Sequence, residues 1–450
     1  MRLRDRLISR LSNLLFILAL SLVLGMTAWL STRHNQVWDW TFNNRNSLAS
    51  ETVDLLSQFE GPLRMVAFVE DNPALHEKIR VVVDRYRRHK PDINLRFVNP
   101  DLEPELAMAE DVRQAGVLIL GYEERRERVQ SLDEAGIAYA LQRLLRDQDL
   151  WVIMTEGHGE ASPFDTENGG LSQWREALNQ AGIQMQPFDT RRGIPLPHNI
   201  DLLAITTPQA DWQPAEVEAV NKYLDNGGSL LWLQDPGAMH GLQALKPTLG
   251  IEFIPGTLVD GNEKIQEMLR ISHPAIIPVL EYGQHEVSKD INTQTLFPLA
   301  QAIQVVEDSN WKATPLLRSL EQSWSNTGPL NESLSFTPDQ GDVAGPLVIG
   351  LALTRELNGQ EQRIVIIGDS QFASNAYIGY GANRLLLGNL VSWLTADEGL
   401  LKLSPRSAPD TQLDMTQNQA VVLAIGLLLV FPGIILLTGL LIWYRRRRRR

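Results

Sequence analysis

The chain of 450 residues contains no cysteine. Disulfide bridges, cysteine-ligated zinc, thiol catalysis and C-x-x-C redox chemistry are therefore excluded. The G-x-x-x-x-G-K-S/T pattern of a P-loop is also missing, so the chain does not hydrolyse a nucleotide in that way. No G-x-G-x-x-G run lies between a predicted strand and a helix, and no H-E-x-x-H spacing is present. We therefore predict no cofactor and no metal.

Charge is distributed unevenly along the chain. The net charge is −13 at pH 7. Residues 1–10 carry +3 and residues 445–450 are six arginines, which leaves −22 on the body, 31–418. A body this acidic repels phosphate backbones, and we expect no binding to nucleic acid. The apolar share of 44% argues against an intrinsically disordered chain, and the length is typical of about three structural units.

Two long runs, 11–30 and 419–444, carry no charged residue and are mostly apolar. Each is long enough to cross a hydrocarbon core of about 30 Å as a helix. The alternative for the first run is a cleaved signal peptide. That run is longer than the usual apolar region of a signal peptide and is not followed by a clean A-x-A site. We therefore predict two transmembrane helices.

The arginines beside these runs predict the topology. Basic residues precede the first run, within 1–10, and follow the second, within 445–450. By the positive-inside rule both ends are cytoplasmic. The expected location is the bacterial inner membrane, with two passes and the body, 31–418, on the periplasmic side. Two spans cannot enclose a solute pathway, so the chain alone is not a transporter.

The first part of the body, 31–148, has the element order β-α-β-α-β-β-α. This order is typical of a thioredoxin-like domain, here without a redox centre. The predicted strands are 64–69, 94–98, 116–122 and 127–131. After a lead-in helix before residue 60, the predicted helices are 73–89, 104–114 and 133–146.

The second part, 149–396, alternates strands and helices. This alternation predicts a doubly wound, mostly parallel α/β domain. The predicted strands are 151–154, 183–188, 202–206, 229–233, 347–353 and 364–367. The predicted helices are 171–181, 214–225, 241–249 and 383–394. A β-rich insertion is expected at about 251–346, and residues 397–418 are predicted to form a stalk.

One polar motif follows the first strand of this second domain. Glu156, His158 and Glu160 alternate with two glycines. Carboxylate, imidazole and carboxylate in this pattern are suited to a polar ligand, a partner contact or, less strongly, a metal. The alternative is a structural turn with a hydrogen-bonded histidine. Its position after a strand matches where α/β sheets place ligands.

Two further polar motifs also follow strands. Asp235 begins an Asp-Pro-Gly turn, for which a purely structural role is the alternative. Asp369 and Ser370 belong to a Gly-Asp-Ser sequence similar to the serine-esterase block. That chemistry needs a later histidine base, and no histidine follows residue 285. Asn375 and Asn383 extend this polar rim, and we assign all of these residues to ligand or partner binding, not to catalysis.

Three blocks of the sequence resemble the GldG-type family, gliding-motility-associated auxiliary subunits of ABC transport systems. They are TEGHGE (155–160), YLDNGGSLLWLQDP (223–236) and VIIGDSQFASNAYIGYGANRLLLGNLVSWL (365–394). The segment 42–59 also resembles that family's stretch after its first span. The resemblance implies an exported α/β body with two membrane anchors, acting beside a separate permease and a separate ATPase.

Two hypotheses for function follow. The first is an auxiliary binding or scaffold subunit of an ABC-type transport system, with a permease, an ATPase, membrane lipid and a cell-envelope or small-molecule substrate as partners. The alternative is a membrane-anchored extracytoplasmic hydrolase that uses the loops 156–160 and 368–375.

Overall fold

The computed structural model describes residues 47–397 except 113, 147–149, 198, 290, 307–308 and 331–333, together with residues 16–17, 19–26, 29, 432, 439 and 443. Residues 47–397 belong to one compact unit. The predicted stalk after Asp397, both basic ends and most of the two predicted spans lie outside the described residues. Within the described part, no helix is both long and apolar enough to cross a membrane.

The N-terminal domain is built on a four-stranded sheet with the order β2-β1-β3-β4. β1 pairs with β2 in parallel and with β3 antiparallel, and β3 pairs antiparallel with β4. The elements are α2 (Ser50–Ser57), β1 (Arg64–Phe68), α3 (Pro73–Arg87), β2 (Asn94–Val98), α4 (Pro104–Ala109), β3 (Val117–Tyr122), β4 (Arg125–Val129) and α5 (Glu134–Leu145). The predicted order of elements in this part of the chain is confirmed.

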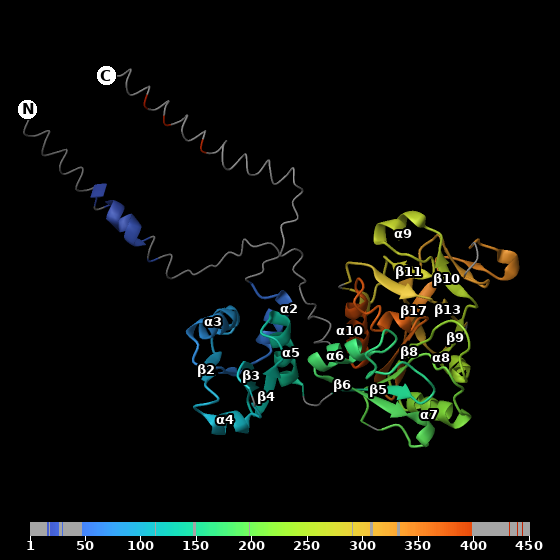
Figure 1. Ribbon diagram of the computed structural model, residues 1–450, viewed down its shortest axis with the longest axis horizontal. Coiled ribbons are helices and arrows are strands. Elements are labelled where there is room, and N and C mark those ends of the chain that lie inside the picture. Colours follow the sequence, from blue (N-terminus) through green and yellow to red (C-terminus); the bar gives the residue numbers. More distant parts are fainter. Residues whose placement is uncertain are drawn as a thin grey trace, which may run out of the picture. The chain divides into compact units, whose positions relative to one another are not determined.

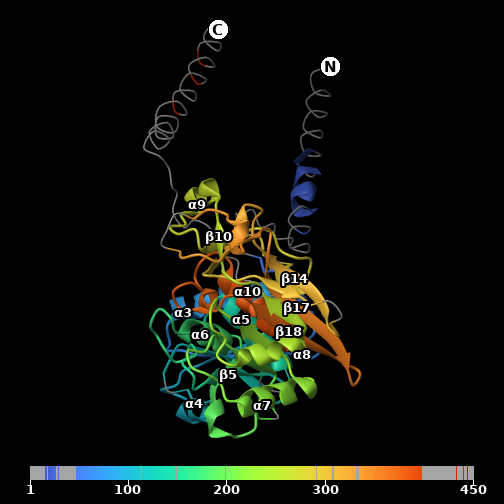
Figure 2. The ribbon, with the colours of Figure 1, turned by 90° about the vertical axis from the view of Figure 1, so that its right-hand side faces the viewer.

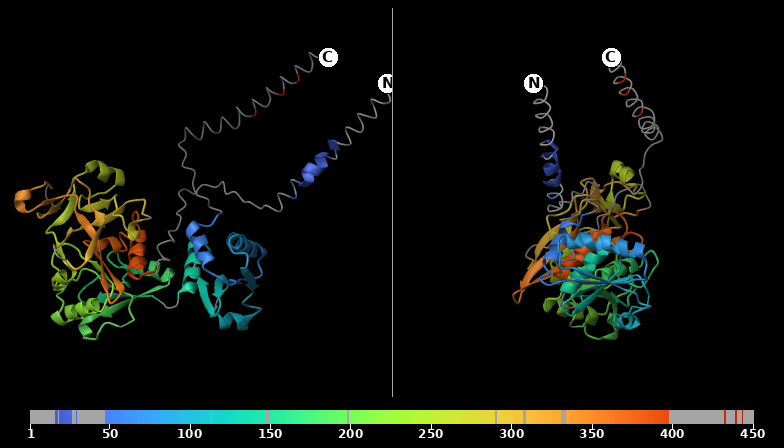
Figure 3. Two further views of the ribbon diagram at one scale, coloured as in Figure 1. Left: turned by 180° about the vertical axis from the view of Figure 1, so that it is seen from behind. Right: turned by 90° about the vertical axis from the view of Figure 1, so that its left-hand side faces the viewer.

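Helix α3 shows how the sequence specifies this domain. Asn72 caps its start, where Asn72 Oδ1 accepts hydrogen bonds from the next free backbone N–H groups, and Pro73 occupies the first helical turn. Its buried side chains are Ile79, Val83 and Tyr86. These join buried side chains of α2, α5 and the sheet in one apolar core, while α4 packs on a second, smaller cluster with Phe68 and Ile119. Figure 3 shows this blue-to-teal domain from two further sides.

The second domain is built on a seven-stranded sheet, the large sheet, with the order β14-β17-β18-β8-β7-β5-β6 (Figure 1). Five strands are parallel, from β6 to β18. The parallel strands are β5 (Leu150–Glu156), β6 (Ile183–Asp189), β7 (Leu202–Ile205), β8 (Leu230–Leu233) and β18 (Gln360–Ile367). The helices are α6 (Ser172–Gln180), η2 (Thr190–Arg192), α7 (Pro214–Asp225), η3 (Leu242–Leu245), α8 (Lys246–Leu249), η6 (Gln371–Ala373) and α10 (Asn383–Leu394).

Alternate residues of each strand point to opposite faces, and the parallel strands carry apolar cores on both faces. On one face, Val152, Leu231 and Val365 share a core with α6 and α10. On the other face, Ile153 and Leu230 share a core with α7, η3 and α8. Burying one such side chain stabilises the fold by about 1.5–3 kcal/mol. The expected doubly wound, mostly parallel arrangement is confirmed for these five strands.

The remaining two strands correct the sequence prediction. β17 (Val348–Leu357) runs antiparallel to β18, and β14 (Lys312–Arg318) runs antiparallel to β17 at the edge of the sheet. Figure 2 shows the three strands side by side. Asn358 and Gly359, with φ of 54° and 79°, join β17 to β18 in the left-handed conformation of a tight hairpin. The two runs that we predicted as separate strands of an α/β unit are therefore one hairpin.

The expected β-rich insertion is confirmed in outline, except that β14 belongs to the large sheet. Small sheets of order β10-β15-β16, β11-β12 and β13-β9 make up the rest. Their strands are β9 (Ile251–Phe253), β10 (Thr257–Asp260), β11 (Ile276–Val279), β12 (Thr295–Pro298), β13 (Ile303–Val305), β15 (Ser323–Asn326) and β16 (Val343–Ala344). Its helices are α9 (Glu263–Leu269), η4 (Glu286–Ser288) and η5 (Pro338–Gln340).

Candidate functional site

Loops that follow β5, β7, β8 and β18 lie at the same edge of the large sheet, because these strands are parallel. In space, β5 lies between β6 and β7, so the direction of the connections reverses between β5 and β7. Open α/β sheets bind ligands at such a reversal. The predicted site residues lie in these loops or just after them, and their contacts decide what each does.

His158 lies between two buried carboxylates. Its Nε2 is 3.2 Å from Oε2 of Glu216 in α7, and its Nδ1 is 3.7 Å from Oε1 of Glu160. The imidazole packs on Trp212 with ring centroids 5.4 Å apart, and Trp212 Nε1 donates a hydrogen bond of 3.1 Å to Glu160 Oε1. His158 is only 5% exposed. We call this group the histidine cluster, and its side chains contact one another in a buried position.

Backbone contacts hold the histidine cluster in place. Glu160 Oε2 accepts from the His158 N–H at 2.7 Å, and Glu216 Oε2 accepts from the Gln213 N–H at 2.6 Å at the start of α7. The His158 carbonyl accepts from the N–H of Gln209. A Cβ at Gly159, whose φ is 83°, would lie 2.8 Å from Gln209 Cβ. The loop after β5 is thereby fastened to the loop after β7, which favours the structural alternative for this motif.

Glu156 stands apart from the histidine cluster. It is the last residue of β5, opposite Asp189 in β6, and is half-buried. Among the described residues, no three histidine, aspartate or glutamate side chains are placed to hold a metal ion. Of the three residues in this motif, His158 and Glu160 are therefore buried partners, and Glu156 is a more exposed carboxylate.

Asp235 and Ser370 form a second group, at the ends of β8 and β18. The Ser370 hydroxyl donates to Asp235 Oδ2 at 2.7 Å, and the Ser370 N–H donates to Asp235 Oδ1 at 2.5 Å. The Asp235 N–H donates to Thr207 Oγ1 at 2.7 Å. Gln301 Nε2 donates to the Asp235 carbonyl at 3.0 Å. Two motifs that are 135 residues apart in the sequence therefore meet directly.

Asp369 is fully buried beside this pair. Its Oδ1 accepts from the Phe372 N–H at 3.0 Å, while its Oδ2 has no hydrogen-bond partner. Burial, and secondly the negative charge of Asp235, raises the pKa of Asp369 well above its usual value. The buried carboxyl therefore favours its neutral form, in contrast to the half-exposed Asp235.

The two predicted asparagines hold loops together. Asn375 Oδ1 accepts from the Gln173 N–H at 2.9 Å, and its Nδ2 donates to the Glu167 carbonyl at 2.7 Å. Asn383 is fully buried, and its amide pairs with both the N–H and the carbonyl of Leu296, at 2.9 and 3.0 Å. Both side chains use their polar atoms on the protein backbone, so the expectation that they form a ligand-binding rim is not supported by these contacts.

Sequence reasoning missed four residues that complete these groups: Thr207, Trp212, Glu216 and Gln301. Glu216 had a partial signal, because Pro214 marks a helix start and a glutamate at the third helical position can accept from the N–H of the residue before the helix. Gln301 had none, since it reaches Asp235 from the insertion, 66 residues away.

Comparison with known proteins defines the class to which this fold and site belong. The family model described as "ABC-type uncharacterized transport system" matches residues 151–392, which is more than half of the chain. The chain therefore belongs to this family of auxiliary components of ABC-type transport systems. The expected resemblance to a GldG-type auxiliary family is confirmed at this level. No curated protein sequence matches the chain.

Three solved structures show distant likenesses to the chain. The chain is similar to "mmIFT52 N-terminal domain" (16% identity, TM-score 0.41, covering 58% of this chain and 100% of that one). It is also similar to two ThuA-like proteins. The one from Bacteroides uniformis has 14% identity, a TM-score of 0.31 and coverage of 55% and 91%. The one from Parabacteroides merdae has 10% identity, a TM-score of 0.32 and coverage of 55% and 90%. With TM-scores this low, none of them indicates a function for this chain.

Proposed function

We propose that this chain is a binding or scaffold subunit of an ABC-type transport system. Its body, 31–418, would lie on the periplasmic side of the bacterial inner membrane, anchored by helices over 11–30 and 419–444. A separate permease and a separate ATPase would be its partners. The observation that carries this proposal is the family match over 151–392, in a chain whose body lies between two long runs without charge.

The arrangement of the candidate site supports a binding role over hydrolysis. A serine hydrolase needs a general base beside its nucleophile. Here the Ser370 hydroxyl donates to Asp235, and both nitrogens of His158 face the carboxylates of Glu160 and Glu216. Within the described residues, no hydrogen bond joins His158 to Ser370. Hydrogen bonds link the loops that follow β5, β7, β8 and β18 to one another. A sheet edge whose loops are held in this way suits a surface that a partner protein contacts.

The N-terminal domain fits the same role. Its strand order β2-β1-β3-β4, with only β1 and β2 parallel, supports the thioredoxin-like class expected from the order of elements. Since the chain has no cysteine, such a domain would act as a scaffold without redox chemistry.

The decisive test is recovery of the complex from its own membrane. The tagged full-length chain is extracted in a mild detergent, and the proteins that come with it are identified by mass spectrometry. We expect a permease and an ATPase in stable amounts. Recovery of the chain alone, or only as a homo-oligomer, would contradict the subunit role.

The proposed topology has its own test, because a chain without cysteine accepts single reporter cysteines without background labelling. Thr166→Cys lies on an exposed loop of the body, and Arg447→Cys lies in the arginine tail. A membrane-impermeant maleimide should label Thr166→Cys in spheroplasts and should label Arg447→Cys only after lysis. The reverse pattern, or equal labelling, would contradict a periplasmic body.

A further inference from the structure

A separate cavity lies away from the loops described above. It is lined by side chains of the strands β14, β17 and β18 of the large sheet. It has a volume of about 940 Å³, within the range of about 300–1,000 Å³ that is usual for ligand pockets. We propose that this cavity binds a small molecule that carries an oxyanion, a phosphate or a carboxylate group. The proposal concerns a different site from the sheet edge and does not depend on the transport role.

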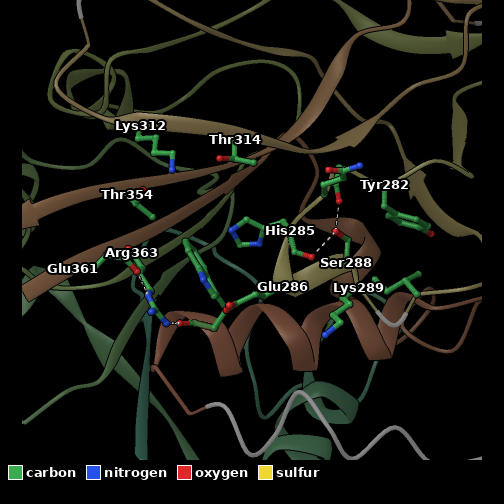
Figure 4. Close-up of a pocket in the computed structure, with 14 residues that line it drawn as sticks. Tyr282, His285, Glu286, Ser288, Lys289, Lys312, Thr314, Thr354, Glu361 and Arg363 are labelled. Carbon is green, nitrogen blue, oxygen red and sulfur yellow. Dashed lines mark hydrogen bonds and ion pairs between the residues drawn. The ribbon is translucent and has the colours of Figure 1, made fainter.

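One side of the cavity is a row of side chains across three strands. Lys312 in β14 is paired with Thr354 in β17, which is paired in turn with Arg363 in β18. Thr314, two residues after Lys312, faces the same side because successive residues of a strand alternate. Figure 4 shows Lys312, Thr314 and Thr354 on these strands, across from His285. The row thus presents the Lys312 ammonium and two hydroxyls to one space, beside Arg363, whose Nη1 donates to the Trp393 carbonyl at 2.9 Å.

The opposite wall is formed by residues 282–289, which include η4, and by Ile291. It is fixed to the edge of β14, where the Gly283 N–H donates to the Leu316 carbonyl at 2.9 Å. A Cβ at Gly283 would lie 1.9 Å from the Pro315 oxygen, so only glycine permits this approach. The Val287 carbonyl accepts from Asn389 Nδ2 in α10 at 2.8 Å. The wall is therefore held at two points, Gly283 and Val287, and the cavity is formed in advance of binding.

The cavity is richer in donors than in acceptors. Its charged lining consists of Lys289, Lys312 and Arg363 against Glu286 and Glu361. Glu361 already accepts from Arg363 Nε at 2.7 Å. Neither lysine ammonium makes an ion pair or a hydrogen bond with any described residue. The chain as a whole has a net charge of −13, whereas the lining of this cavity has more cationic than anionic side chains. A positively charged cavity attracts anions.

His285 adds a neutral donor. Its Nδ1 accepts from the Val287 N–H at 3.3 Å, so its proton resides on Nε2. Burial lowers the pKa of His285, which keeps the ring neutral at pH 7. The ring is held edge-on against Trp393, with centroids 4.7 Å apart. Ammonium groups, threonine hydroxyls and an imidazole N–H together are the donors that an oxyanion requires.

The test is calorimetric titration of the full-length chain in detergent, at low salt, with sodium pyrophosphate and, separately, with citrate as probes. We expect saturable binding of at least one probe, and the stronger of the two distinguishes a phosphate from a carboxylate preference. Lys312→Gln should weaken binding by about tenfold, the size of one charge-assisted contact. Lys312→Arg, which keeps the charge, should bind within about threefold of the unchanged chain.

The matched control is Lys222→Gln, which removes an exposed lysine from α7 on the other face of the large sheet. This variant should bind both probes as the unchanged chain does. Equal weakening by Lys222→Gln and Lys312→Gln would show that only overall charge matters and would overturn the proposal. If the chain is folded and neither pyrophosphate nor citrate binds at millimolar concentration, the proposal is overturned as well.

Discussion

The parallel and antiparallel parts of the large sheet use their polar residues in opposite ways. At the end of the parallel strands, polar side chains bond to one another and to the backbone of neighbouring loops, as Asp235 does with Ser370 and Thr207. On the antiparallel strands, Lys312 and Thr354 lie within the strands and face a cavity. Polar residues at strand ends can therefore serve mainly as braces, while a pocket is lined by residues that belong to no motif.

This difference follows from local backbone chemistry. A strand that ends in a loop leaves backbone N–H and carbonyl groups without ladder partners, and buried groups of this kind must find others. Aspartate, serine and asparagine supply them, as Asp369 does for the Phe372 N–H after β18. Inside β17 and β18 the ladder pairs the backbone on both sides, and β14 is paired on one side with β17, so the side chains on the open face are available to a ligand.

The largest effect that we expect in the parallel part is at Asp369. Its raised pKa means that the folded state holds a proton that the unfolded state has released above about pH 4. The contribution of Asp369 to stability is therefore present at acid pH and is lost as pH rises toward the folded pKa. Asp369→Asn, which is neutral at every pH, should be more stable than the unchanged chain at pH 8, and this advantage should shrink toward pH 4.

Urea unfolding of the full-length chain in detergent, repeated from pH 4 to pH 8, measures this difference. Asp225→Asn, an exposed position at the end of α7, is the control and should follow the unchanged chain at every pH. A variant Asp369→Asn that is destabilised by the same amount at every pH would show that Asp369 is not held neutral.

Asn383→Ala should come next. The substitution removes the partners of the Leu296 N–H and carbonyl, and each buried backbone group left unpaired costs about 1–3 kcal/mol. We expect a loss of about 3 kcal/mol in the free energy of unfolding, measured by urea denaturation. Arg384→Ala, at the next and exposed position of α10, should change little. If Asn383→Ala keeps its normal stability but no longer binds a partner, Asn383 is a binding residue, as the sequence predicted.

The sequence predicted the parallel part well, because period, caps and turn residues act locally. The bounds Pro214–Asp225 and Asn383–Leu394 were predicted as observed. The hairpin at Asn358 and Gly359 carried a readable signal, an Asn-Gly pair, that we did not use. By contrast, the contact of Gln301 with Asp235 and the pairing of Lys312 with Thr354 depend on chain segments that are distant in the sequence, and no local pattern encodes them.

His158→Ala tests whether the histidine cluster is a brace, as its contacts indicate. The change leaves two buried carboxylates without the imidazole between them, and it removes the ring that packs on Trp212. We expect a loss of about 2 kcal/mol in the free energy of unfolding. Glu218→Ala, an exposed change in α7, is the control for thermal and urea unfolding. Unchanged stability with loss of a copurifying partner would instead make His158 a binding residue.

The smallest effect concerns the turn that creates the antiparallel part. Asn358 has a φ of 54°, a conformation that asparagine tolerates and alanine does not. Asn358→Ala should cost about 1 kcal/mol, and Asn358→Gly, which permits the same φ, much less. Because the turn is exposed, the loss should show most clearly as faster hydrogen exchange in β17 and β18 while the parallel strands keep their protection. If hydrogen exchange rises equally in the parallel and the antiparallel strands, the large sheet unfolds as one unit. The antiparallel strands that line the cavity are then not independent in stability of the parallel strands.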